Sequence, residues 1–159
     1  MNYIEELSST RTTIATAATG VVFYTPLNKI LLGKRRNVPF AVYPGLWCFP
    51  GGFQEIGKER LIDTVSREVE EECKILIPSE RWYLFYMDDV PGADPRYAHV
   101  INACFKADAT HDDFIAAGPS DELEEVDWFS LHEAIRLDLA FNHSTILKEF
   151  IIQDGWEFY

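Results

Sequence analysis

The chain has 159 residues, of which 47% are hydrophobic and 14% aromatic, so we expect a single domain over residues 1–159 with a core of its own. Its 26 acidic and 14 basic residues give a formal net charge of −12, which argues against broad binding to nucleic acid or to a membrane surface. Neither a signal peptide nor an apolar run near the ~18 residues of a membrane span is evident, so we expect a cytoplasmic protein. The odd count of three cysteines predicts reduced, buried thiols.

The first third of the chain has the alternating pattern of strands joined by turns. Residues 1–12 are polar, and we expect them to be frayed or to add a strand. Small, aliphatic and β-branched residues alternate after them, as is typical of strands. The expected elements are a strand over 13–24, a turn at 26–28, a hairpin strand over 29–34, a loop over 36–45 and a short strand over 47–49. The basic run Lys34, Arg35 and Arg36 lies where the second strand ends, and it either binds an anion or is simply solvated.

Residues 59–73 are predicted to form an amphipathic helix. One face carries aliphatic residues at helical spacing, and the other carries Arg67, Glu68, Glu71 and Glu72. Carboxylates three and four residues apart lie on the same face and repel one another unless a positive charge lies among them. Hard ions such as Mg²⁺ take oxygen ligands, so a bound divalent metal would account for these neighbouring carboxylates.

The second half of the chain mixes strands and helices. We expect strands over 81–88, 98–107 and 125–129, with a loop rich in Pro, Gly and Asp over 89–96. Ser130 and Glu133 have the capping-box spacing that opens a short helix, and Asn142 is expected to cap a final one. This order predicts an α/β (α+β) fold around a mixed or antiparallel sheet.

The segment Gly51–Ile77 resembles the Nudix box, whose pattern is G-x5-E-x7-R-E-U-x-E-E-x-G-U with U an aliphatic residue. Glu59 and the run from Arg67 to Glu72 match its second half. Gly52 and Glu59 are separated by one residue more than the pattern has, near Gly57 and Lys58. Lys74 also replaces the box glycine, and a left-handed conformation costs a lysine about 1 kcal/mol or more. We therefore expect the helix to end differently here.

The resemblance implies an α/β/α sandwich around a mixed sheet and a site for Mg²⁺ or Mn²⁺. By this resemblance Glu68, Glu71 and Glu72 form the metal cluster, with Glu72 the expected direct ligand and the carbonyl of Gly51 or Gly52 as a further one. Glu59 and Arg67 would pair and hold the loop against the helix. The alternative for that pair is an ordinary surface ion pair worth under ~1 kcal/mol.

Nudix enzymes often take a further glutamate from a loop before a late tryptophan-bearing strand, as base or ligand. Glu122, six residues before Trp128, is the residue we expect in this role, and Glu124 and Glu125 are its rivals. All three are otherwise solvated loop residues. His99 and His143 are expected to be structural.

Other stretches resemble the ADP-ribose pyrophosphatase branch related to the Nudix domain of bifunctional nicotinamide-mononucleotide adenylyltransferases. These stretches are Asn37–Phe40 with Gly45–Gly52, Asp94–Tyr97, and Leu139–Ile146, where Asn142 stands in place of an aspartate. ADP-ribose needs an apolar face for adenine and donors for phosphate and ribose. The candidate substrate-binding residues are Arg36, Phe40, Tyr43, Arg96, Tyr97 and Phe141.

The resemblance implies hydrolysis of a nucleotide pyrophosphate bond, with ADP-ribose giving AMP and ribose 5-phosphate. Alternatives are a pyrophosphohydrolase of nucleoside triphosphates, dinucleoside polyphosphates or NADH, a Nudix-like nucleotide sensor without turnover, and a structural interaction module. Transcription-regulating relatives append a DNA-binding domain, for which we expect no room after the last helix. We expect a small-molecule nucleotide as ligand and no nucleic-acid or membrane partner. A homodimer is consistent with the family.

Overall fold

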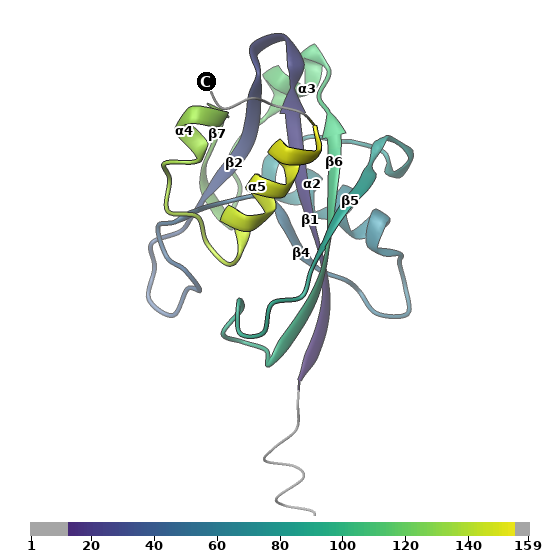
Figure 1. The fold of residues 1–159 in the computed structure, drawn as a ribbon, viewed down its shortest axis with the longest axis vertical. Coiled ribbons are helices and arrows are strands. Elements are labelled where there is room, and N and C mark those ends of the chain that lie inside the picture. The colour runs from purple at the N-terminus through teal and green to yellow at the C-terminus, as the bar shows by residue number, and fades with distance from the viewer. Residues whose placement is uncertain (1–12, 155–159) are drawn as a thin grey trace, which may run out of the picture.

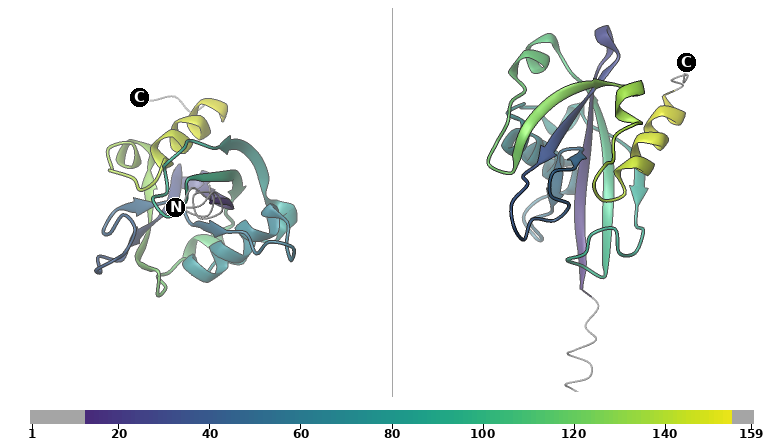
Figure 2. Two further views of the ribbon diagram at one scale, coloured as in Figure 1. Left: turned by 90° about the horizontal axis from the view of Figure 1, so that it is seen from below. Right: turned by 90° about the vertical axis from the view of Figure 1, so that its left-hand side faces the viewer.

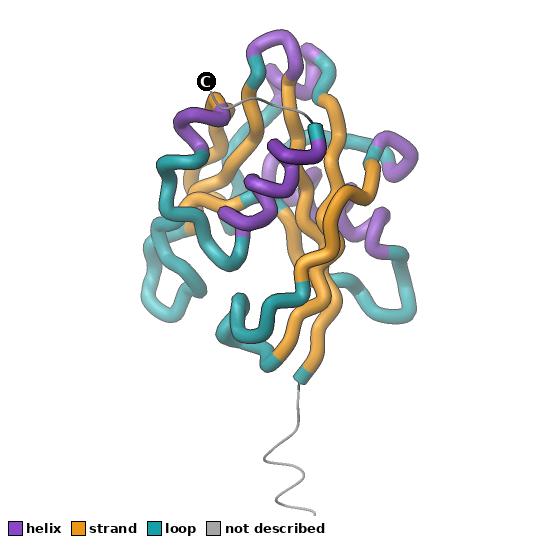
Figure 3. Tube along the Cα trace, viewed as in Figure 1, coloured by secondary structure: helices purple, strands orange, loops and turns teal. Residues whose placement is uncertain are grey.

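The computed structural model describes residues 13–154, which form a mixed sheet with helices on both faces (Figure 1). The strands are β1 (Ile14–Tyr24), β2 (Lys29–Arg35), β3 (Trp47–Cys48), β4 (Gly51–Phe53), β5 (Tyr83–Asp88), β6 (His99–Asp108) and β7 (Leu123–Ser130). The helices are α2 (Leu61–Cys73), α3 (His111–Ala116), α4 (Leu131–Ala134) and α5 (His143–Gln153), with 3-10 turns at Thr25–Leu27 and Ser79–Arg81. Figure 3 shows the same arrangement by type of element. The prediction for residues 1–12 concerns a segment outside the described residues.

Strand β1 is the centre of the sheet. The strand order is β3-β2-β1-β6-β5, with β4 added to β1 and β7 added to β2. β1 runs parallel to β6 from the pair Ile14–His99 to the pair Phe23–Asp108, and it is antiparallel to β2 and β4. The sheet is therefore mixed, as the sequence predicted.

Two helices cover opposite faces of this sheet (Figure 2). Residues on one strand alternate between the two faces. Accordingly Val22 joins the buried cluster that includes Val65 and Val69 of α2, whereas its neighbour Val21 joins the cluster that includes Ile146 of α5. The layering is that of an α/β/α sandwich, and the predicted fold class is confirmed.

The end of α2 corrects one prediction. Lys74 takes the left-handed conformation, with φ 65° and ψ 24°, and its backbone N–H donates to the Glu70 carbonyl at 3.0 Å. We had expected the helix to end differently because a lysine is strained there. The fully buried Ile75 and Ile77 follow directly, and their burial offsets the strain of Lys74.

Other boundaries also differ from the sequence prediction. α2 begins at Leu61 with Arg60 as its N-cap, not at 59, and α3 was not predicted. Gly51 opens a strand where only a turn was expected, because this segment pairs with β1. Asn142 stands at the N-cap position of α5, but its side chain makes no capping hydrogen bond to the helix backbone.

The described residues agree with the expectation for the cysteines. Their three cysteines, Cys48, Cys73 and Cys104, are unpaired and buried. Burial raises the pKa of the Cys48 thiol to about 12, so this thiol is protonated at neutral pH. None of the helices in residues 13–154 combines the length and apolar character needed to cross a bilayer.

Gly51→Ala is expected to destabilise the protein, because the backbones of β1 and β4 approach closely at this position. A Cβ on Gly51 would lie 2.3 Å from the Ala18 carbonyl oxygen and 2.9 Å from the Thr19 Cα, and backbone atoms cannot rotate away. Overpacking of this kind costs about 1–3 kcal/mol in free energy of unfolding. Urea titration followed by tryptophan fluorescence measures it. In the control Gly118→Ala the nearest contact would be 3.9 Å, and we expect a change within about 0.5 kcal/mol. Equal stability of the two variants would contradict this account.

Candidate functional site

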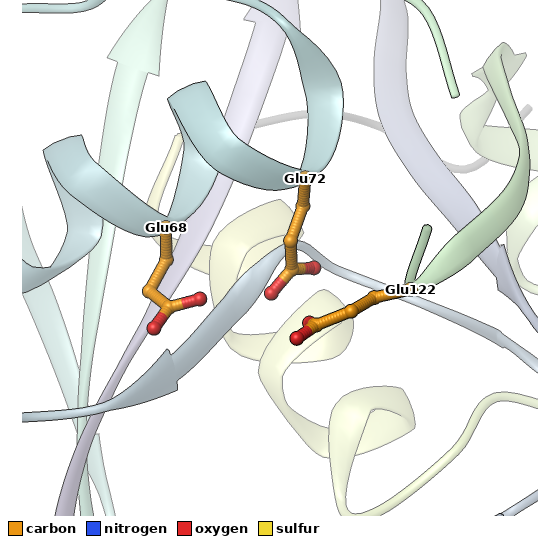
Figure 4. A group of neighbouring side chains, drawn as sticks. All are labelled: Glu68, Glu72 and Glu122. Carbon is orange, nitrogen blue, oxygen red and sulfur yellow. The ribbon is translucent and has the colours of Figure 1, made fainter. Parts of the chain in front are cut away.

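Three glutamates meet beside helix α2. Glu68 and Glu72 are one helical turn apart and project from the same face, and Glu122 reaches them from the loop before β7 (Figure 4). One carboxylate oxygen from each of the three lies within 4.8 Å of the others. We call these residues the carboxylate group. The structure thus brings together two of the predicted metal ligands and the predicted loop glutamate.

Burial makes the carboxylate group electrostatically unfavourable without a cation. Glu72 is 5% exposed, and its burial together with the charges of Glu68 and Glu122 raises the pKa of Glu72 well above its usual value. Burial also raises the pKa of Glu68. A hard divalent cation prefers such a set of carboxylate oxygens and would offset their repulsion. The donor set therefore fits Mg²⁺ or Mn²⁺.

Gly52 is packed directly against Glu68. A Cβ on Gly52 would lie 2.4 Å from the Glu68 carboxyl carbon and 2.5 Å from its Oε1. A side chain at this position would force the Glu68 carboxylate to move, so the glycine lets strand β4 approach it closely. This places Gly52 next to the carboxylate group, where the sequence predicted a ligand.

Arg67 connects the neighbouring segments around the carboxylate group. Its Nη2 donates to Glu59 Oε1 at 2.8 Å and to the Phe53 carbonyl at 3.1 Å, and its Nε donates to Glu59 Oε2 at 3.1 Å. Nη1 donates to Glu68 Oε1 at 2.9 Å and to Glu71 Oε2 at 3.4 Å. The Glu59–Arg67 pair predicted from the sequence is present, and it joins the loop, strand β4 and helix α2.

The remaining acidic candidates lie at the edge of this arrangement. Glu71 is exposed, and its side chain contacts Arg67 outside the carboxylate group. Glu124 lies 3.6 Å from Lys34 in an ion pair, and Glu125 is an exposed residue of β7. Of the three loop glutamates considered from the sequence, Glu122 is the one in the carboxylate group.

The carboxylate group opens into a cavity of about 600 Å³. This cavity is lined from α2 across β4 and β1 to the end of β5, the start of β6 and the start of α5. A volume of this size suits a nucleotide-sized ligand.

The predicted substrate-binding residues divide into two sets. Arg36, Phe40, Arg96 and Phe141 line the cavity, whereas Tyr43 and Tyr97 are not among its lining residues. Tyr43 instead donates its hydroxyl to the Ala93 carbonyl at 2.7 Å and packs edge-on against Phe141. Phe40 lies at the cavity with a left-handed backbone conformation, φ 69°. Its side chain is fully exposed, so its ring is accessible to a ligand.

The arginines of the cavity have distinct partners. Arg36 donates through Nε to the Asp121 carbonyl and through Nη2 to the Ser120 carbonyl at 3.3 Å, so it holds the loop that carries Glu122. Arg96 is paired with Asp94 at 2.7 Å. These contacts give Arg36 a positioning role that the sequence did not reveal.

Sequence reasoning missed Arg35 and three polar cavity residues. The Arg35 guanidinium lies over the Phe141 ring at 5.0 Å, its Nε donates to the Val42 carbonyl at 2.6 Å, and it lines the cavity. The basic run at 34–36 contained the signal but did not single out Arg35. The three polar residues are Asp88 and Asn102, which the sequence analysis did not single out, and His143, which it expected to be structural.

Glu59→Gln is expected to flatten the pH dependence of stability in acid. Hydrogen bonds from Arg67 hold the pKa of Glu59 at about 2, below its ordinary 4.5. A depressed folded-state pKa contributes stability that is complete above the unfolded pKa and is lost as the pH falls towards 2. Urea titrations at pH 7, 5, 4 and 3 should show a smaller acid loss for Glu59→Gln than for the wild type. The exposed Glu80→Gln should leave the wild-type profile intact, and parallel wild-type and Glu59→Gln curves would refute this assignment.

Arg36→Ala is expected to weaken Mn²⁺ binding about tenfold, equivalent to about 1.4 kcal/mol. Without the two carbonyl contacts, the loop at 120–122 no longer holds Glu122 beside Glu68 and Glu72. Titration calorimetry measures the affinity, with the exposed Arg136→Ala as charge-matched control. An unchanged Mn²⁺ affinity in Arg36→Ala would rule out this positioning role.

Comparison with known proteins identifies relatives of the chain. An ADP-ribose pyrophosphatase of Methanocaldococcus jannaschii is 38% identical over 124 residues, which cover 78% of this chain and 66% of that protein. An ADPR-responsive transcriptional repressor, NtrR of Acinetobacter baylyi, is 29% identical over 132 residues, covering 76% and 46%. The chain thus spans just under two thirds of the length of the pyrophosphatase and about half of the length of the repressor.

Comparison of structures gives the same fold. The NUDIX domain of Shewanella oneidensis NrtR in complex with ADP ribose matches with a TM-score of 0.74 at 24% identity, covering 96% of this chain and 99% of that one. The model of the NUDIX domain family matches residues 15–150. Since this match covers most of the sequence, the chain belongs to the NUDIX domain family.

Proposed function

We propose that this protein hydrolyses a pyrophosphate bond in a nucleoside diphosphate linked to another moiety, with Mg²⁺ or Mn²⁺ as cofactor. The observation that carries the proposal is the carboxylate group, whose three members all line the cavity. ADP-ribose is the substrate that we infer, with AMP and ribose 5-phosphate as products. The 38% identity to an ADP-ribose pyrophosphatase supports this choice.

Glu68, Glu72 and Glu122 would hold the cation, and Gly52 packs against Glu68 beside them. A bound divalent cation neutralises charge on the phosphate oxygens and lowers the pKa of water in its coordination shell. Arg67 and Glu59 do not need to contact substrate in this scheme. Their role is to fix the separation of the carboxylates.

Hydrolysis adds water across the phosphoanhydride. The water oxygen forms a bond to one phosphorus, and the bridging oxygen leaves with the other phosphate. Glu122 is exposed and comes from a loop, and we assign to it the uptake of the proton from water. Arg35, in the cavity wall, supplies positive charge for the phosphates that the anionic protein otherwise repels.

A nucleotide sensor without turnover is the second candidate. The similarity to a repressor that responds to ADPR favours it. A sensor needs the cavity but not the carboxylates, whereas hydrolysis needs both. The intact carboxylate group therefore supports catalysis over sensing.

A substrate panel with Mg²⁺ tests the proposal. We expect the highest kcat/KM for ADP-ribose among ADP-ribose, NADH, nucleoside triphosphates and dinucleoside polyphosphates, with activity lost on chelation by EDTA. Product analysis by ion-exchange chromatography should give AMP and ribose 5-phosphate. A low rank for ADP-ribose would overturn the substrate assignment, and the lack of any Mg²⁺-dependent hydrolysis would favour the sensor.

Glu72→Gln separates catalysis from binding. The amide cannot supply the charge that a cation needs, so we expect kcat to fall by at least about 100-fold, with ADP-ribose still bound in calorimetry. The neighbouring exposed Glu70→Gln is the matched control, and its kcat should stay within about threefold of the wild type. Wild-type turnover by Glu72→Gln would exclude the carboxylate group as the catalytic centre.

A further inference from the structure

The cavity has a second polar region away from the carboxylate group. Asp88 ends strand β5 and pairs in register with Asn102 of β6, so both side chains project from the same face of the sheet. This is the face covered by α5, because Cys104, two residues beyond Asn102, belongs to the buried cluster of α5. His143 reaches the same wall from the first residue of α5.

Asp88 is a buried carboxylate that lines the cavity. It is 5% exposed, and no lysine or arginine ion pair of the described residues includes it. Asn142 Nδ2 donates to its Oδ1 at 2.7 Å, and the backbone N–H of Val90 also donates to the carboxylate. A carboxylate accepts about four hydrogen bonds, so Asp88 retains acceptor capacity towards the cavity. A buried carboxylate that lacks hydrogen-bond donors costs free energy.

Donors stand beside this acceptor. The backbone N–H of Phe49 donates to His143 Nδ1 at 2.9 Å, and burial lowers the pKa of His143 to about 3. The ring is therefore neutral with its proton on Nε2, which makes Nε2 a donor. Asn102 accepts the Thr19 hydroxyl at its Oδ1 at 3.0 Å, which leaves the amide N–H₂ for other acceptors.

The chemistry of this region selects its occupant. A phosphate would be repelled by the Asp88 carboxylate, so the occupant carries no negative charge. Hydroxyl groups both donate and accept, and a vicinal diol matches one carboxylate beside two N–H donors. The nearby walls are Ala17, Thr19 and Val100, together with the rings of Phe49 and Phe141, which pack against His143. Phe49 is 2% exposed and the Arg35 guanidinium lies over the Phe141 ring, so the packing of both rings is taken up within the protein and not by a stacked base.

We propose that Asp88, Asn102 and His143 form a subsite for a neutral, hydroxyl-rich group, namely the sugar ring attached to the second phosphate of the substrate. The inference rests on the proposed function and extends it, since it assigns the residues that distinguish a sugar-linked diphosphate from other esters. Asn142 is a positioning residue in this arrangement. It bridges Asp88 and Thr145, whose hydroxyl donates to Asn142 Oδ1 at 3.1 Å.

The test compares two substrates that differ only in this group, ADP-ribose and the methyl ester of ADP. Hydrogen bonds to a charged acceptor are stronger than those between neutral groups, so the wild type should prefer ADP-ribose in kcat/KM by about 10-fold to 100-fold. Asp88→Asn keeps an acceptor for Asn142 but removes the charge, and it should reduce this preference at least fivefold. Asn102→Ala should act in the same direction without changing the Asp88–Asn142 contact.

Ser144→Ala is the matched control, because it changes an exposed residue next to His143 that contributes no side chain to the cavity. Its substrate preference should equal that of the wild type. A wild type without preference would overturn the proposal. The proposal would also be overturned if Asp88→Asn and Asn102→Ala lowered kcat/KM for both substrates equally. That result would indicate a nucleobase at this wall or a purely structural role.

Product binding keeps the subsite testable without turnover. In the presence of Mg²⁺, calorimetry should show that Asp88→Asn lowers the affinity for ribose 5-phosphate at least fivefold and leaves the affinity for AMP unchanged. If the wild type hydrolyses neither ester, the proposed function fails, but selective weakening of ribose 5-phosphate would still support the subsite. A loss of affinity for AMP alone, or for neither ligand, would overturn the subsite proposal.

Discussion

The arrangement of this protein depends on holding like charges together. Glu68 and Glu72 lie one turn apart on α2 and face Glu122, and their repulsion has to be offset for the helix to remain folded against the sheet. Arg67 contributes the nearest positive charge. Because its guanidinium bonds Glu59, Glu68 and the Phe53 carbonyl at once, it fixes the loop, strand and helix that surround the carboxylate group.

The central strand β1 determines what the cavity contains. Its antiparallel partner β4 carries Gly52 up to Glu68, and its parallel partner β6 carries Asn102 on the face that α5 covers. The cavity therefore has an acidic region suited to a cation and phosphates, and a second region of mixed donors and acceptors. Arg35 supplies positive charge to the same cavity, and its charge affects the pKa values of both Glu72 and His143.

Several sequence predictions failed for a common reason. Lys74 adopts the conformation that its residue type disfavours, because burial of the residues after it outweighs local strain. Asn142 was expected to cap α5, but its amide bonds Asp88, a residue 54 positions away. Arg36, the predicted phosphate ligand, does line the cavity, and its guanidinium also bonds the carbonyls of Ser120 and Asp121. Each outcome depends on a partner that is distant in the sequence.

The sequence alone determined most of the elements and the charges. Periodicity placed the main strands and helix α2, and spacing on that helix put Glu68 and Glu72 on one face next to Arg67. Helical spacing is a local property, so the part of the site that lies on α2 could be predicted from the sequence. Only the tertiary structure decided that Glu122 completes the carboxylate group, that Arg35 lines the cavity and that Asp88 meets Asn142 and Asn102. Those contacts form between segments dozens of residues apart, and packing of the sheet, not spacing along the chain, brings them together.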